Sequence, residues 1–195
     1  MIAARAQQQE SNSVTSQSIY LIGFSGTGKS TIARLLGAQL GLPTYDLDSM
    51  IAERSGMSIP AIFEREGEPG FRDRETEALE HVASLGACVV ATGGGAPLRD
   101  QNRRLMAGSG WVIALEGRPE TLHARMLRQR QQADPAALRP LLDTADPLAQ
   151  LRALKQSRQA MYALAEWTVH TDRLRAEQVV AEIVRAVALL EQARP

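Results

Sequence analysis

A nine-residue glycine-rich stretch stands between an apolar run and a helical pattern, and few folds accommodate that order. Residues 23–31 read Gly-Phe-Ser-Gly-Thr-Gly-Lys-Ser-Thr and match the pattern G-x-x-x-x-G-K-[ST]. The apolar run 19–22 precedes them, and apolar residues at helical spacing follow from Ile32 to Leu40. A strand, a glycine loop and a helix in this order predict an α/β domain whose loop, here called the phosphate loop (residues 23–31), cradles phosphate groups.

Each residue type in the phosphate loop has a chemical reason. Glycines at 23, 26 and 28 allow positive φ and let backbone N–H groups approach phosphate oxygens. Lys29 brings a positive charge to the β- and γ-phosphates of a nucleotide, and we expect its side chain to point into a solvent-filled site. The Ser30 hydroxyl can bind Mg²⁺. The residues expected to bind ATP here are Gly26, Thr27, Gly28, Lys29, Ser30 and Thr31.

The rest of the chain alternates short apolar runs with longer helical patterns. This alternation predicts a parallel sheet with crossover helices on both faces. The strands are expected at 19–22, 44–45, 88–91, 112–115 and 167–169. The helices are expected at 29–41, 47–55, 58–66, 74–85, 99–108, 119–131, 147–164 and 175–191.

Length and composition fit one domain, at residues 18–195, preceded by a flexible tail at residues 1–17 that is rich in Gln and Ser. The 22 basic and 22 acidic residues balance, which argues against a nucleic-acid partner or a membrane surface. Cys88 is the only cysteine, so an internal disulfide is impossible and a cytoplasmic location is expected. Because Cys88 lies in an apolar run, we interpret it as a core residue.

Two carboxylates follow the second expected strand, as Asp46-Leu47-Asp48. Ligands of open α/β sheets bind at the carboxyl ends of strands. One carboxylate can therefore hold a hydrated metal ion, while the other accepts a proton from a substrate hydroxyl. An aspartate acting as the N-cap of a helix at residues 49–55 is the structural alternative.

Three further features lie along the chain. The charges between Glu64 and Glu75 suit either a solvated helix face or an arginine held rigidly toward a cleft. Thr92-Gly93-Gly94-Gly95 suits either a flexible turn or a loop whose backbone touches a ligand. The stretch 132–146 breaks the helical period, and we expect a lid around residues 128–142 that carries Arg139.

Six elements in this order resemble the shikimate kinase family. They are the phosphate loop, Asp46-Leu47-Asp48, Phe71-Arg72-x-x-Glu75, Gly93-Gly94-Gly95, Arg139-Pro140-Leu141-Leu142 and Arg158-x-x-Met161-Tyr162. The resemblance covers roughly residues 18 to 190. It implies a P-loop NTPase-type three-layer α/β sandwich, with a five-stranded parallel sheet in the order 2-3-1-4-5 and helices on both faces. It also implies transfer of the ATP γ-phosphoryl group to the 3-hydroxyl of shikimate, with Mg²⁺ as cofactor, in chorismate biosynthesis.

The resemblance also implies roles for individual residues. Lys29, Asp48 and Arg139 would be catalytic, with Asp48 as the base. Ser30 and Asp46 would hold the metal ion. Arg125 and Arg139 would complete the ATP site. The shikimate site would consist of Asp48, Arg72, Gly93, Gly94, Gly95 and Arg158, with Glu75 orienting Arg72.

Two other functions fit parts of the pattern. A kinase of another sugar acid, such as gluconate, would share the phosphate loop, but the three glycines and Arg139-Pro140-Leu141-Leu142 favour shikimate. A catalytically silent metabolite-binding module would be expected to lack Lys29, Asp48 or Arg139, and all three are present. We expect a monomer whose partners are shikimate and ATP, with no nucleic acid and no membrane.

Overall fold

Five parallel strands form one sheet in the computed structural model, which describes residues 15–132 and 145–194. The strands are β1 (Ser18–Ile22), β2 (Thr44–Asp46), β3 (Val89–Ala91), β4 (Gly110–Glu116) and β5 (Trp167–His170). Their order is β2-β3-β1-β4-β5, and every neighbouring pair is parallel. The sheet order implied by the family resemblance is confirmed, and each strand lies where the apolar runs predict it.

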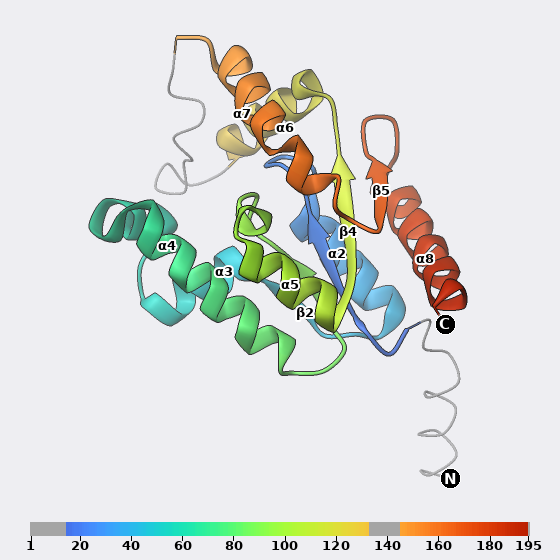
Figure 1. Cartoon of the computed structure of the whole chain (residues 1–195). Coiled ribbons are helices and arrows are strands. Elements are labelled where there is room, and N and C mark those ends of the chain that lie inside the picture. The colour runs from blue at the N-terminus through green and yellow to red at the C-terminus, as the bar shows by residue number, and fades with distance from the viewer. Residues whose placement is uncertain (1–14, 133–144, 195) are drawn as a thin grey trace.

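Helices cover both faces of this sheet (Figure 1). Alternate residues of a strand point to opposite faces, and β1 is buried along its whole length, so each face carries apolar side chains that must be covered. Tyr20 and Ile22 of β1 face one hydrophobic cluster, whereas Ile19 and Leu21 face the other. The second cluster packs on α2 (Lys29–Leu40) and α8 (Ala176–Ala193). The first cluster packs on α3 (Leu47–Ser55), α4 (Ile59–Ala83), α5 (Asp100–Ser109), α6 (Pro119–Gln132) and α7 (Pro147–Tyr162).

The loops that carry the expected site residues leave the sheet at one edge. Ala91 pairs with both Leu21 and Asp46, and Ile22 pairs with Ala114, so β1 to β4 end side by side. In Figure 1 the arrows of β4 and β5 point toward the side where α6 and α7 lie. The parallel register therefore places the residues after β1, β2, β3 and β4 around a common space.

Helix α4 corresponds to the two helices predicted at 58–66 and 74–85. It runs from Ile59 to Ala83, but Gly67 interrupts it with non-helical geometry, φ 68° and ψ −176°, so two helices meet there at a kink. Pro69 follows two residues later, where a helix that restarts after Gly67 needs no backbone N–H from it. The first helix therefore ends at the predicted residue, whereas the second begins directly after Gly67 rather than at residue 74.

The described chain begins with packed residues. Thr15 is buried and its hydroxyl donates a hydrogen bond to Glu191 of α8, so packing starts before residue 18, where the domain was expected to begin. The rest of the expected tail, residues 1–14, lies outside the described residues. Cys88 is buried in the core as predicted, and burial raises the pKa of its thiol. No helix in the described part of the chain is long and apolar enough to cross a membrane.

Candidate functional site

The phosphate loop has the backbone geometry that an anion site requires. Gly23 and Gly28 have φ of 135° and 95°, a region that favours glycine. A Cβ on Gly23 would also collide with the carbonyl oxygen of Leu115 on β4. Gly28 is the N-cap of α2 and supplies no side-chain cap, so the positive end of the helix dipole opens toward the loop.

Lys29 is buried rather than projecting into solvent as we expected. Its Nζ donates hydrogen bonds to the carbonyl oxygens of Gly23, at 2.8 Å, and Phe24, at 3.0 Å. These two carbonyls belong to the phosphate loop, so the ammonium group is held against its own loop. Ser30 and Thr31, in the first turn of α2, are exposed.

Asp46 and Asp48 have different positions at the end of β2. Asp46 is the N-cap of α3, and its Oδ1 accepts a hydrogen bond from the backbone N–H of Ser49 at 3.2 Å. An aspartate therefore caps this helix, as the structural alternative expected, but the helix begins at Leu47 rather than at residue 49, so the cap is Asp46 and Asp48 lies in the first turn. Asp48 is partly buried in the first turn of α3, and its Oδ1 lies 3.1 Å from the position that a Cβ on Gly93 would occupy. Asp48 thus adjoins the three-glycine loop.

Arg72 is held between two carboxylates of α4. Its Nη1 donates to Oε2 of Glu75 at 2.8 Å, and its Nε and Nη2 donate to Oε1 of Glu68 at 3.3 and 3.1 Å. The Arg72 side chain is 11% exposed and that of Glu75 is 0% exposed, whereas that of Glu68 is 62% exposed. Burial raises the pKa of Glu75, and the Arg72 guanidinium opposes that rise. The implied role of Glu75 in orienting Arg72 fits this contact; Glu68 was missed.

The three glycines are a contact surface rather than a flexible turn. A Cβ on Gly95 would collide with the Arg72 guanidinium, and a Cβ on Gly93 would collide with Oε1 of Glu75. The carbonyl of Gly94 accepts a hydrogen bond from the Tyr162 hydroxyl at 2.6 Å. The side chains of α4 and α7 therefore approach this backbone closely, and the contact of the loop with a ligand stays a prediction.

Arg158 reaches the same place from α7. Its Cζ lies 5.8 Å from the centroid of the Phe24 ring in the phosphate loop. Burial raises the pKa of Tyr162 to about 12, and the nearby guanidinium groups of Arg158 and Arg72 partly oppose this. Arg72 and Arg158, which are far apart in the sequence, thus both act electrostatically on the Tyr162 hydroxyl. Tyr162 was part of a quoted motif, but we had assigned it no role.

Arg125 occupies the other side of the phosphate loop. Its Nη1 donates to Oγ1 of Thr171 at 2.9 Å and to the carbonyl oxygen of Gly26 at 3.5 Å, and its Nη2 donates to the carbonyl oxygen of Thr171 at 2.7 Å. Arg125 is therefore fixed between the loop and the end of β5. Of the lid expected around residues 128–142, residues 128–132 form the end of α6, and the rest, Arg139 included, lies outside the described residues.

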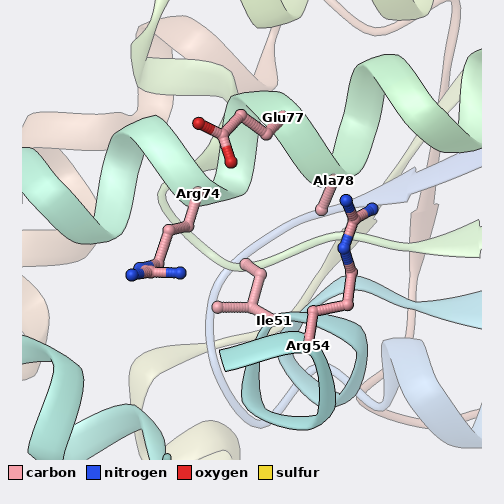
Figure 2. Close-up of a pocket in the computed structure, with 5 residues that line it drawn as sticks. All are labelled: Ile51, Arg54, Arg74, Glu77 and Ala78. Atoms are coloured by element: carbon pink, nitrogen blue, oxygen red, sulfur yellow. The ribbon is translucent and has the colours of Figure 1, made fainter. Parts of the chain in front are cut away.

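A separate small pocket lies between α3 and α4 (Figure 2). Arg54 and Ile51 from α3 and Arg74, Glu77 and Ala78 from α4 line it. The Arg74 guanidinium is already paired with Glu66, at 2.7 Å. None of the expected site residues lines this pocket, so we place the chemistry at the carboxyl edge of the sheet.

The fold and the phosphate loop define the class of P-loop nucleotide-binding proteins. The family model for shikimate kinase matches residues 25–188. The chain belongs to the shikimate kinase family, whose members are ATP-dependent phosphotransferases acting on a hydroxyl group.

Similar proteins agree with this assignment. A shikimate kinase of Thioalkalivibrio sulfidiphilus is 46% identical over 168 residues, which are 86% of this chain and 85% of that one. A shikimate kinase of Thiobacillus denitrificans is 44% identical, covering 87% of each chain. The structure of a shikimate kinase from Acinetobacter baumannii in complex with shikimate superimposes with a TM-score of 0.84 at 35% identity, covering 95% of this chain and 99% of that one.

Proposed function

We propose that this protein transfers the γ-phosphoryl group of ATP to the 3-hydroxyl of shikimate, the reaction implied by the family to which it belongs. The supporting observation is the meeting of Arg72, Arg158 and Asp48 around the three-glycine loop, next to the phosphate loop. Fixed guanidinium groups suit a carboxylate, and a nearby carboxylate suits hydroxyl groups. An acidic, hydroxylated acceptor matches both.

The phosphate loop performs the nucleotide half of the reaction. Its backbone N–H groups and the N-terminus of α2 would bind the phosphate oxygens, with the hydroxyls of Thr27, Ser30 and Thr31 nearby. The buried ammonium of Lys29 would stabilise the negative charge that develops on the transferring group. Arg125 would contact the adenine base from the end of β5, and Arg139 would approach the phosphates.

The acceptor half would rely on Asp48. Its carboxylate would take the proton from the 3-hydroxyl while that oxygen forms a bond to the γ-phosphorus and the bond to the β-phosphate oxygen breaks, releasing ADP. Arg72 and Arg158 would bind the shikimate carboxylate, and Gly93, Gly94 and Gly95 would line the pocket. The buried Glu75 would keep Arg72 in place during this step.

The residues present fit a Mg²⁺ ion carried with ATP. The described residues contain no group of three or more His, Cys, Asp or Glu that would form a metal cage. Mg²⁺ usually keeps several waters and binds through one or two protein oxygens and the phosphates. The Ser30 hydroxyl would bind it directly. Asp46 would act through water, because β2 and β1 are separated by β3 and so lie roughly 10 Å apart.

We propose that the protein works as a cytoplasmic monomer. The single cysteine, Cys88, is a buried free thiol, which suits a reducing compartment. Light scattering coupled to size-exclusion chromatography should give a mass near 21.2 kDa. A mass twice that value would contradict the monomer.

A coupled assay of ADP release with a panel of hydroxy acids tests the substrate. We expect shikimate to give the highest kcat/KM, and a higher value for gluconate would contradict the acceptor assignment. Two variants test the roles. Arg72→Ala should raise the KM for shikimate on the order of tenfold to a hundredfold with little change for ATP. Asp48→Asn should instead lower kcat, because it keeps the shape and removes the base.

A further inference from the structure

We propose that Glu116 and Lys155 form a positioning pair that sets the location of Arg158 in the acceptor pocket. This inference rests on the proposed role of Arg158 in binding the shikimate carboxylate. Neither residue belongs to the motifs that carry the family resemblance, and they lie 39 positions apart in the sequence.

The pair lies at the edge of the sheet where the site is built. Glu116 is the last residue of β4, and its Oε2 accepts a hydrogen bond from Nζ of Lys155 on α7 at 2.6 Å. The Lys155 side chain is 12% exposed and that of Glu116 is 8% exposed. Oε1 of Glu116 is buried and has no hydrogen-bond partner among the described residues. Lys155 is therefore the ion-pair partner of this buried carboxylate.

Helix α7 turns one face toward the site. Lys155, Arg158 and Tyr162 follow one another at spacings of three and four, which places them along one side of the helix. Lys155 bonds to the end of β4, Arg158 lies over Phe24, and Tyr162 bonds to the Gly94 carbonyl. Arg158 therefore lies between two anchor points, and its place relative to the phosphate loop depends on both.

Glu116 also contacts the nucleotide side, but only through its backbone. Its carbonyl oxygen accepts hydrogen bonds from the N–H of Thr171 at 2.8 Å and from its Oγ1 at 3.0 Å. Thr171 in turn binds Arg125. Because every substitution at 116 keeps that carbonyl, changes to the Glu116 side chain should leave ATP binding intact while they alter the position of α7.

A purely structural ion pair would behave differently. Removing one member of a buried pair leaves an uncompensated charge and destabilises a protein, whereas replacing both members with apolar residues of similar size is often neutral or stabilising. The effect of the pair on stability can therefore be separated from its effect on the position of Arg158. The comparison is between variants that remove one member of the pair and a variant that replaces both.

The test uses Lys155→Met, Glu116→Gln and the double variant Glu116→Met/Lys155→Met. We expect each single variant to raise the KM for shikimate roughly fivefold to tenfold, to leave the KM for ATP within about twofold and to lower the thermal midpoint. The double variant should recover the midpoint and keep the raised KM for shikimate. A double variant in which both the thermal midpoint and the KM for shikimate return to the wild-type values would overturn the positioning role. Single variants whose KM values for shikimate and for ATP rise equally would also overturn it. Lys155→Arg keeps the charge, so its shikimate KM should stay near that of the wild type; a rise equal to that of Lys155→Met would also overturn it.

The matched control is the ion pair of Glu120 and Arg152, which joins α6 and α7 about one helical turn away from Lys155. Nη2 of Arg152 lies 2.6 Å from Oε1 of Glu120, but both side chains are 54% exposed. Arg152→Met should leave both KM values unchanged, because exposed pairs contribute little. Failure of wild-type protein to phosphorylate shikimate would refute the proposed function itself. An active wild type with unchanged KM values in the Lys155 and Glu116 variants would refute only the positioning pair.

Discussion

The phosphate loop and the proposed acceptor pocket (Asp48, Arg72, Gly93, Gly94, Gly95 and Arg158) lie next to each other at one edge of the sheet, but they differ in what would form their binding groups. The phosphate loop has backbone N–H groups, and its glycine geometry is fixed by contacts such as Gly23 against Leu115. The proposed acceptor pocket would use the side chains of Arg72, which is paired with Glu75, and of Arg158, which lies over Phe24. Phosphate is common to all nucleotides, whereas the acceptor differs between kinases. On this proposal, specificity would reside in side chains whose positions depend on partners elsewhere in the chain.

Replacing Lys29 gives the largest effect we expect and tests the nucleotide region. Lys29→Met should lower turnover at least about a hundredfold, because a preorganised positive charge is lost where negative charge develops. Two loop carbonyls also lose their donor, so a modest fall in thermal midpoint should accompany the change. Steady-state kinetics and a melting curve measure the two effects. Turnover within about threefold of the wild type would remove Lys29 from the mechanism.

Gly95→Ala tests whether the acceptor region depends on the position of Arg72. The new methyl group would force the Arg72 guanidinium to move, although Glu75 and Glu68 hold it. The end of an arginine side chain can shift at little cost to folding, so we expect a rise of roughly tenfold in the KM for shikimate with a small change in melting.

Gly94→Ala is the control for this prediction. A Cβ at residue 94 would lie no closer than 3.6 Å to its neighbours, and those neighbours belong to the phosphate loop. This variant should melt like the wild type and leave Arg72 in place. If Gly95→Ala also leaves the shikimate KM unchanged, the position of Arg72 does not limit acceptor binding.

The smallest expected effect lies outside both regions, at the kink in α4. Hydrogen bonds from Arg74 and Arg65 lower the pKa of Glu66 from 4.5 to about 2. The Glu66 carboxylate therefore binds a proton less tightly in the folded state than in the unfolded chain. The contacts of ionised Glu66 with Arg74 and Arg65 thus stabilise the fold above about pH 4.5. That contribution is lost as the pH falls through about 2.

Glu66→Gln should accordingly show a smaller decrease of thermal midpoint than the wild type between those two pH values. Glu64→Gln changes an exposed carboxylate of the same helix and should follow the wild-type curve. Both variants should keep the wild-type KM for shikimate, which would separate the kink from the acceptor pocket. Parallel curves for Glu66→Gln and the wild type would contradict the role of the pair.

Local patterns were enough to predict the strands and the phosphate loop. The run 19–22 is continuously apolar because both of its faces are covered, and the glycines of residues 23–31 follow the short local pattern of a phosphate-binding loop. The family resemblance added the sheet order and the partnership of Arg72 with Glu75, which the structure shows in contact.

Other features depended on packing that no local pattern records. The periodicity placed the start of the second α4 helix at residue 74, but the chain restarts its helix directly after Gly67, supported by Glu66 paired with Arg74 and by Phe63 stacked on Phe71 with ring centroids 4.5 Å apart. The burial of Lys29 arises from the fold of its own loop. The contact of Glu116 with Lys155 joins a strand end to a distant helix, so only the three-dimensional arrangement reveals it.

The position of Cys88 has a practical consequence for measuring motion in this enzyme. Its thiol is buried against Ser18, and burial raises its pKa, so thiol-directed dyes should react with it slowly. A cysteine introduced at an exposed site, for example at Gln156 on α7 or Glu64 on α4, would then be the preferred point of attachment. Fluorescent or spin labels can therefore be placed on α4 or α7 without first removing a competing thiol.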